Sequence, residues 1–412
     1  MSLHLRQRML GEYVGNLRKA TDTIVFTVNC RRNEGSRCGR DPKWPQPCRL
    51  GAVFLLSCLL LFAGATQAEE DWTPYFPKVA NLPSKQVSPP MVLIQVGDPL
   101  PPVLRFAIPL PESNWKRIKG LPEQEGTQVL ASITAPGGLA FGLVEVYSLV
   151  PAQEVNQLDF LHYFMNLNEI TLIKSRITFT TGGLTAEALG IIPAPQGSAD
   201  EPIFMRAAVY RSGKRFFVVR CQAAKSQFLP LSQAFAVVTG FFSPQVLTAP
   251  ALIGNWRTYC LANQICYAGP DEGWNRLSSA KDQSEDAFAL SSGEVNSGLL
   301  HVKAVQAPLS QATSPPDRID VLTESLTSQG LKVIQKEPAF TFDHANFEAT
   351  FHGQTIHCKD SKDQPVDLMV ASGLTPKGAV VVWLITVSKE LDPWAWMANK
   401  RAFEVVCDNL KP

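Results

Sequence analysis

The chain has 412 residues, which is enough for two or three domains of ordinary size. Hydrophobic residues make up 45% and charged residues 18%, a balance that excludes a wholly disordered chain. The net charge of +1 combines a basic segment, residues 1–68 with ten Lys/Arg against four Asp/Glu, and a remainder of 28 against 33. Sequence-independent nucleic-acid binding needs a basic face, so this acidic body predicts no nucleic-acid partner.

Residues 49–68 have the features of a secretory signal peptide. A run of 16 apolar or small residues, Leu50 to Ala65, follows the basic Arg49 and precedes small residues. The run is shorter than the ~20 residues of a membrane-spanning helix, so we expect membrane contact only if this segment stays uncleaved. The sequence therefore predicts a periplasmic or secreted protein. We interpret residues 1–48 as a disordered leader or a mis-called gene start, and residues 69–102 as a proline-rich extended lead-in, in which Met91–Val96 is a candidate edge strand.

Residues 103–243 predict a first α+β module. Alternating apolar residues and glycine-rich turns, such as Gly137-Gly138, indicate strands joined by hairpins. Apolar residues at helical spacing predict one helix over 156–168 and a closing helix over 226–241. The expected strands are 104–108, 127–133, 139–147, 170–179, 184–192, 203–210 and 215–220.

Residues 258–412 repeat this order after a linker, 244–257. Trp274 follows Trp115 by 159 positions, within a shared pattern of proline, polar turn and tryptophan. The buried face of the predicted helix recurs 161 positions later: Leu158, Leu161 and Met165 correspond to Ile319, Leu322 and Leu326. We therefore predict two tandem α+β modules, each an antiparallel sheet flanked by helices in an α/β/α sandwich, and a duplication of one module.

This order of elements, together with Phe106, Pro111 and Trp115 and with Pro270 and Trp274, resembles the Mog1/PsbP-like superfamily. The resemblance covers roughly 104–242 and 258–410. It implies α/β/α sandwiches and a binding or assembly protein without catalysis. The superfamily has no shared active site, so no catalytic residue is carried over.

A second resemblance concerns the start of the second half. Trp256, Cys260, Cys266 and Tyr267 resemble the opening of invasion-associated locus B-type periplasmic proteins, which are β-rich. In that alternative the second half is not a copy of the first.

Five cysteines follow the signal segment, and export permits disulfides. Four of them lie in the second half, where three pairings are open. We favour Cys260–Cys266, which closes a small loop, and Cys358–Cys407. Cys221 lies in a strand-like run and is predicted to be a buried free thiol.

Common catalytic motifs, including G-x-S-x-G, H-E-x-x-H and the Walker loop, are missing from the sequence. One cluster contains candidate ligands: His344, Glu348, His352, His357 and Cys358. We expect exposed polar side chains and a disulfide cysteine here, with no catalytic residue, metal or cofactor. The alternative is a metal-binding protein or a hydrolase that uses the segment from His344 to Cys358.

Trp394 and Trp396 lie at the start of the predicted last helix, 391–410, after the N-cap residue Asp392 and Pro393. Residues two apart on a helix do not share a face. Either both pack in the core or between domains, or one is exposed and marks a partner surface. Trp115 and Trp274 are predicted to cover the ends of the two sheets.

Together these features predict an exported, non-enzymatic binding or assembly accessory protein of the bacterial cell envelope. Its partner is expected to be a protein or an envelope component. The alternatives are the metal-binding or hydrolytic protein described above and a structural envelope subunit. An enzyme should present a pocket with convergent titratable groups, whereas a binding module should present an apolar groove or sheet edge.

Overall fold

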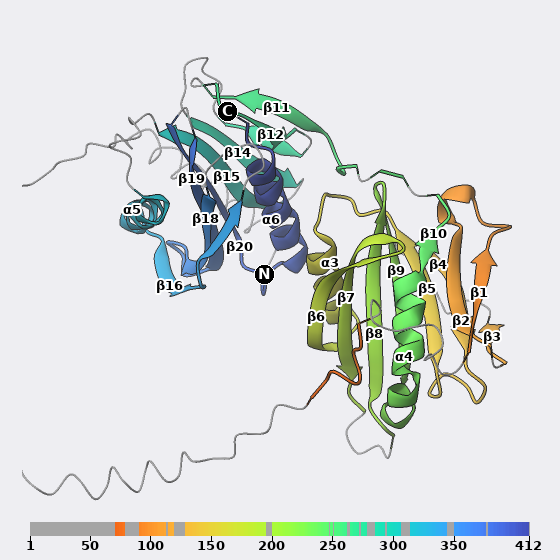
Figure 1. Ribbon diagram of the computed structural model, residues 1–412. Helices are drawn as coiled ribbons and strands as arrows, with labels where there is room; N and C mark the ends of the chain where they lie inside the picture. The colour runs from red at the N-terminus through yellow and green to blue at the C-terminus, as the bar shows by residue number, and fades with distance from the viewer. Residues whose placement is uncertain are drawn as a thin grey trace, which may run out of the picture.

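The computed structural model describes residues 71–78, 90–112, 114–118, 128–194, 200–246, 248–249, 251–261, 264–271, 273–277, 285–292, 295–305, 314–343, 350–375 and 378–411. The predicted leader and signal peptide lie outside these residues. The chain forms two modules side by side, the first built from β1 to β10 and the second from β11 to α6 (Figure 1). Within the described residues, no helix is long and apolar enough to cross a membrane.

The main sheets of the two modules have the same antiparallel strand order. In the first module the order is β3 (Lys116–Ile118), β4 (Gln128–Thr134), β5 (Leu143–Leu149), β9 (Arg215–Ala224), β8 (Ile203–Ser212), β7 (Gly183–Ile192) and β6 (Thr171–Thr180). In the second it is β13 (Trp274–Arg276), β14 (Glu285–Ser292), β15 (Val295–Val305), β20 (Gly378–Val387), β19 (Pro365–Thr375), β18 (Thr350–Lys359) and β16 (Lys332–Lys336). An additional strand, β17 (Phe340–Asp343), also pairs with β18.

The correspondence between the modules extends to an irregularity in the strands. The pairing of β6 shifts register between Leu172 and Lys174, and the pairing of β16 shifts between Val333 and Gln335. These two positions are 161 residues apart, the spacing already seen in the helices. Because a shift of register turns the following side chains to the other face, a shared shift keeps the inward and outward residues of both edges equivalent.

Each sheet carries one helix on each face. In the first module, α3 (Gln157–Leu167) packs through Leu161 and Met165, and α4 (Lys225–Phe241) covers the opposite face through Phe235. In the second, α5 (Pro315–Ser328) and α6 (Pro393–Asp408) cover opposite faces. This arrangement confirms the predicted α+β fold class (Figure 1).

The helix starts follow from local chemistry. Asn156 caps α3 by accepting a bond from the backbone N–H of Leu158, and Asp392 caps α6 by accepting one from Ala395. Ser314 and Asp317 form a reciprocal capping box at α5. Such caps satisfy backbone donors that have no partner within the helix and typically stabilise it by about 1 kcal/mol.

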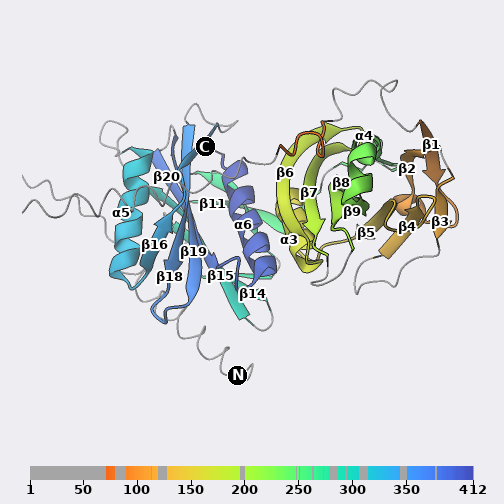
Figure 2. The same ribbon diagram turned by 90° about the horizontal axis from the view of Figure 1, so that it is seen from below.

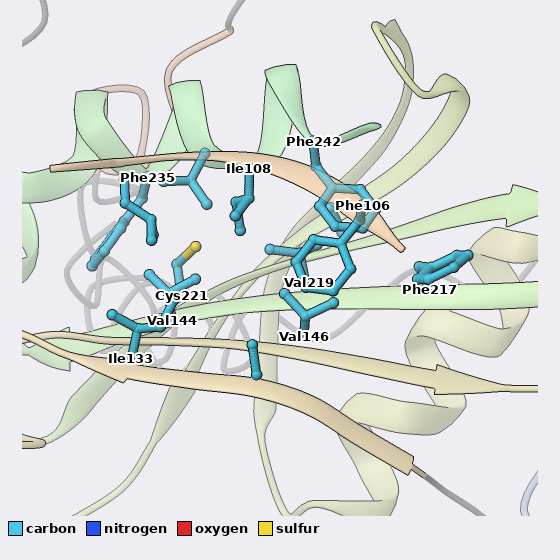
Figure 3. Close-up of a cluster of buried hydrophobic side chains, with 14 of the residues drawn as sticks. Phe106, Ile108, Ile133, Val144, Val146, Phe217, Val219, Cys221, Phe235 and Phe242 are labelled. Carbon is cyan, nitrogen blue, oxygen red and sulfur yellow. The ribbon is translucent and has the colours of Figure 1, made fainter. Parts of the chain in front are cut away.

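A small hairpin precedes each main sheet. In the first module β1 (Met91–Val96) and β2 (Phe106–Pro111), with β10 (Ser243–Pro244), form a three-stranded sheet. Phe106 and Ile108 of β2 point into the core between the main sheet and α4, close to Val219, Val146 and Phe242 (Figure 3). In the second module β11 (Trp256–Cys260) pairs with β12 (Cys266–Pro270).

Trp115 and Trp274 are half-buried and pack against the cores of their own modules. A side chain at Gly142 would begin 2.7 Å from the Trp115 ring, so the ring uses the space that this glycine leaves. The repeated tryptophan therefore packs against the core in each module.

Candidate functional site

The edge strand β6 carries the most exposed apolar surface of the first module's main sheet. Among the described strands, β6 pairs only with β7, so its outer backbone faces away from the sheet. Phe179 is 80% exposed, Ile177 is 49% exposed and Leu184, opposite Phe179 on β7, is 46% exposed. An exposed apolar edge promotes association with other chains, because it presents unpaired backbone groups beside apolar side chains.

A pocket of about 410 Å³ lies beside this edge. The N-terminal end of α3, the turn between β6 and β7, and one residue of α6 form its wall. Its apolar lining comes from Val155, Ile177, Leu184 and Ala186, and its polar lining includes Arg211 and Arg401. We call Ile177, Phe179, Leu184 and this pocket the β6 edge site. An extended segment added to β6 could place one side chain in the pocket while its backbone pairs with the strand.

A buried charge network lies on the other face of the same edge. Arg206 of β8 is fully buried, and its Nη2 donates to both Glu187 oxygens at 2.9 and 3.0 Å. Arg176 of β6 donates to Glu187 Oε2 through Nη2 at 2.7 Å and Nε at 3.0 Å. The Thr239 hydroxyl of α4 donates to Glu187 Oε1 at 2.9 Å. These four residues form what we call the clamp.

The electrostatics of the clamp favour the ionised carboxylate. Burial raises the pKa of Glu187, but the Arg206 and Arg176 guanidiniums outweigh this effect, and the pKa is lowered from 4.5. A buried carboxylate between two guanidiniums keeps its charge because each oxygen receives charged hydrogen bonds. Removing it would leave Arg206 as an uncompensated buried cation.

A second buried carboxylate, Glu154, joins the two modules. Arg211 of β8 donates to it through Nη1 at 2.6 Å and Nη2 at 2.9 Å. The backbone N–H of Ile253, in the connection between the modules, donates to Oε2 at 2.6 Å. Arg401 of α6 lies 3.5 Å from Oε1. One side chain thus contacts the first module, the connecting segment and the second module.

The helices α3 and α6 meet at this junction (Figure 2). Trp394 meets Tyr163 edge to face at 5.4 Å between ring centroids, and Lys400 bonds Asp159 at 2.7 Å. Trp396 donates through Nε1 to Asp367 at 2.7 Å. Both tryptophans are half-buried and pack against the core of the first module. Trp394 and Trp396 therefore pack between the modules, which is the inter-domain alternative of the sequence analysis.

A cavity of about 260 Å³ lies at the same junction, next to Glu154. Its walls include Trp256 of β11, Trp274 of β13 and Asn399 of α6. It is smaller than most ligand pockets, which measure about 300–1,000 Å³.

The cysteines confirm one predicted disulfide and correct the other. Cys260 and Cys266 are bonded. Neither Cys358 nor Cys407 forms a disulfide, so the predicted Cys358–Cys407 bond was wrong. Cys358 of β18 points toward α5, whereas Cys407 belongs to α6 on the opposite face. The sheet separates the two thiols, and no rotamer can bridge it. Cys221 is free and buried, as predicted, and burial raises its thiol pKa.

The described members of the candidate cluster, His352, His357 and Cys358, do not converge on one point. His344 and Glu348 lie outside the described residues. His352 and His357 are five positions apart in a continuous stretch of β18, so they lie on opposite faces. Cys358 faces away from His357, and burial raises the pKa of its thiol to about 12. Within the described residues, no group of three His, Cys, Asp or Glu side chains is placed to hold a metal.

His357 takes part in a different arrangement. Its Nδ1 lies 2.8 Å from Asp367 and its Nε2 lies 3.2 Å from Glu337. The hydrogen bond to Asp367 raises the pKa of His357. Asp367 is held from its other side by Trp396, so the pair is tied to the junction between the modules.

Neither the clamp nor the β6 edge site was predicted from the sequence. An arginine inside a strand carries no sign of which face it occupies, and alternation alone does not show which strand ends the sheet. One usable signal was that Glu187 and Arg206 each lie within a mostly apolar stretch of their strand. Charged residues on the inward side of a strand are uncommon unless they are paired.

Comparisons with known proteins give distant likenesses. No protein-family model and no curated protein matches the chain. Cyanobacterial PsbP (CyanoP) from Synechocystis sp. PCC 6803 is similar over 38% of this chain and 92% of its own, at 15% identity and a TM-score of 0.27. PA94 of Pseudomonas aeruginosa, a protein of unknown function, is similar over 39% and 98%, at 15% and 0.24. The T6SS immunity protein TplEi of Pseudomonas aeruginosa is similar over 78% and 96%, at 11% and 0.21. TM-scores below 0.5 assign no family.

Proposed function

We propose that the chain is a non-enzymatic binding or assembly accessory protein of the bacterial cell envelope, built from a duplicated Mog1/PsbP-like module. One observation carries the proposal: β6 presents a ten-residue edge with exposed apolar side chains beside a 410 Å³ pocket. This is the kind of feature that a binding module presents. The identical strand orders and the shared register shift support the duplication, and they favour it over an unrelated second half.

The partner of the β6 edge site is a protein segment in extended conformation. Main-chain pairing with β6 would supply affinity, and side chains on alternate positions would supply specificity. Ile177 and Phe179 lie on the side of the strand that also contacts the pocket. A partner strand with apolar side chains at alternate positions would therefore fit this surface. Lys174 is exposed and adds positive charge to the strand, which favours a partner strand with acidic residues.

The hydrolase alternative has less support. The described residues that face His357 offer carboxylates and an indole, and the nearest thiol in sequence, Cys358, points to the other face of the sheet. A nucleophilic mechanism needs a nucleophile within hydrogen-bond reach of the base.

Site-specific photo-crosslinking tests the proposal. A photoreactive amino acid replaces Phe179 in the full chain, and a matched variant carries it at Val321, an exposed apolar position of α5 at 41% exposure. In cells, we expect a discrete crosslinked protein for position 179 and none for position 321. A Phe179→Asp variant should lose the same protein from an affinity capture of the envelope fraction, while Val321→Asp should retain it. Equal crosslinking at both positions, or capture that is insensitive to Phe179→Asp, would refute the proposal.

A further inference from the structure

Residues 71–78, which we call the strap, lie across the clamp of the first module (Figure 1, the orange-red segment at the start of the coloured chain). Phe76 is 4% exposed and belongs to the core. The guanidinium carbons of Arg176 and Arg206 lie 3.9 and 4.9 Å from the centre of its ring. An aromatic ring beside two desolvated cations gains both apolar burial and cation–π attraction.

The two arginines of the clamp also donate hydrogen bonds to backbone carbonyls of the strap. The Phe76 carbonyl accepts from Arg176 Nη1 at 3.0 Å. The Pro77 carbonyl accepts from Arg176 Nη2 at 2.8 Å and from Arg206 Nη1 at 3.0 Å. Two consecutive carbonyls therefore receive three charged hydrogen bonds from side chains.

The sequence of the strap fits a site that offers donors and few acceptors. Pro77 has no backbone N–H, so burying the Phe76-Pro77 unit leaves no donor of Pro77 without a partner. The N–H groups of Tyr75 and Phe76 bond to the Trp72 carbonyl within the strap's own turn, at 3.1 and 3.0 Å. No strand among the described residues pairs with residues 71–78. The strap is thus held as a bound peptide is held, by a ring and two carbonyls.

The first half of the strap adds an aromatic contact. Trp72 and Tyr75 pack on Phe204 of β8, with ring centroids 5.9 and 5.3 Å away. Phe204 is itself 1% exposed and belongs to the core, so it is positioned by the module. The module therefore recognises a peptide in which an aromatic residue is followed by a turn and then by an aromatic–proline pair, here Phe76-Pro77.

The clamp is positioned without help from the strap. Glu187 bonds Arg206, Arg176 and Thr239, and Arg206 Nε donates to the Thr239 hydroxyl at 2.9 Å. These bonds link β6, β7, β8 and α4. Loss of the strap would uncover the Nη donors of both arginines in a site that is already formed, and preorganised donors bind a ligand at lower entropic cost.

We propose that the clamp is a peptide-binding site for a short aromatic–proline segment, which the strap fills in cis and which a peptide of the same chemistry can enter in trans. This site is distinct from the β6 edge site. Arg176 points toward the α4 side of β6, whereas Ile177 and Phe179 point to the α3 side. The proposal therefore stands whether or not β6 binds a partner.

Peptide exchange tests the proposal on the full chain. A protease site is inserted within residues 79–89, between the strap and β1, and the chain is cut after purification. A fluorescent peptide of residues 71–78, Asp-Trp-Thr-Pro-Tyr-Phe-Pro-Lys, is then added, and binding is followed by fluorescence anisotropy. We expect the peptide to bind the cut chain and to be displaced by its unlabelled form. Its Phe76→Ala form should bind at least about ten-fold more weakly, because ring burial and the cation–π contacts are lost.

Variants of the chain separate the clamp from the fold. Arg176→Gln in the cut chain should weaken peptide binding, while Lys116→Gln, an exposed position on β3 at the opposite edge of the same sheet, should leave it unchanged. In the uncut chain, Phe76→Ala should allow the peptide to bind where the unaltered uncut chain excludes it. Circular dichroism and tryptophan fluorescence report whether each variant keeps its fold.

Two results would overturn the proposal. One is that no labelled peptide enters the cut chain or the uncut Phe76→Ala chain while both remain folded. The other is that the cut chain unfolds as its N-terminal fragment leaves. Either would mean that the strap is a permanent part of the core.

Discussion

The two modules share a strand order and differ at the edge where that order ends. In the first module β6 continues over ten residues, and among the described strands none pairs with its outer side. In the second, β16 has five residues, and the chain returns to β18 as the separate strand β17. A side chain at Gly353 would begin 2.4 Å from the Phe340 ring, so Phe340 of β17 lies directly on the sheet at this edge.

The contrast extends below the edges. The first module buries Arg206 and Glu187 under its long edge, whereas the edge of the second is bordered by exposed ion pairs such as Lys332–Asp363. The same strand order thus carries an open edge with a charged clamp in the first module and a short, partly covered edge in the second. Because a sheet edge takes little part in the central packing, the two edges can differ while the cores stay alike.

The largest expected effect comes from removing the clamp's carboxylate. Glu187→Ala should lower the free energy of unfolding by about 3–5 kcal/mol, since Arg206 would remain buried without its partner. Urea unfolding followed by tryptophan fluorescence measures the change. The control is Lys332→Ala in the second module, where both partners of the ion pair with Asp363 are more than half exposed and the change should stay below about 1 kcal/mol. Similar losses of unfolding free energy in the two variants would contradict the difference between the buried ion pair of the first module and the exposed pair of the second.

The ion pair of Glu187 with Arg206 also predicts how the free energy of unfolding depends on pH. The pKa of Glu187 is lowered in the folded protein, so its contribution is present above pH 4.5. It is lost as the pH falls through the lowered pKa.

A second test concerns the likeness of the modules. Met165 of α3 and Leu326 of α5 are 161 positions apart and buried at 1% and 5% exposure. Met165→Ala and Leu326→Ala should each destabilise their own module by about 2–5 kcal/mol through a cavity. Hydrogen exchange resolves which module is affected. If either change left its module unaltered, the two helices would not be equivalent parts of one repeat.

The smallest expected effect concerns His357 in the second module. The pKa of His357 is raised above 6.5, chiefly by its hydrogen bond to Asp367. The stability that the charged histidine contributes is therefore full below pH 6.5 and lost as the pH rises through the folded pKa. Its side chain is 38% exposed, so the change should stay under about 1 kcal/mol. His357→Gln should flatten this part of the profile of unfolding free energy against pH, and an unchanged profile would assign the titration to another group.

Much of the fold could be predicted because its elements carry local signals. The helix predicted at 156–168 is Gln157–Leu167, and the closing helix predicted at 391–410 is Pro393–Asp408. Their caps and apolar spacing are local properties of the sequence. The Cys260–Cys266 bond was predictable for the same reason, because a loop of this length brings its ends together.

The candidate sites depend on information that is not local. Cys358 and Cys407 failed to pair because one faces α5 and the other lies in α6, and the sequence does not state which face each helix covers. The clamp joins Arg176, Glu187 and Arg206 from three strands with a segment about a hundred positions earlier. The β6 edge site depends on which strand is last in the sheet, which only the assembled topology decides.

Glu154 gives the junction a mechanical property. A linker alone would leave the orientation of one module relative to the other unrestrained. Here one carboxylate takes hydrogen bonds from Arg211 and from Ile253 and lies 3.5 Å from Arg401, and Arg211 and Arg401 also line the pocket of the β6 edge site. A ligand that displaced Arg211 or Arg401 in that pocket would change the contacts of Glu154, so we expect the angle between the modules to depend on whether the pocket is occupied.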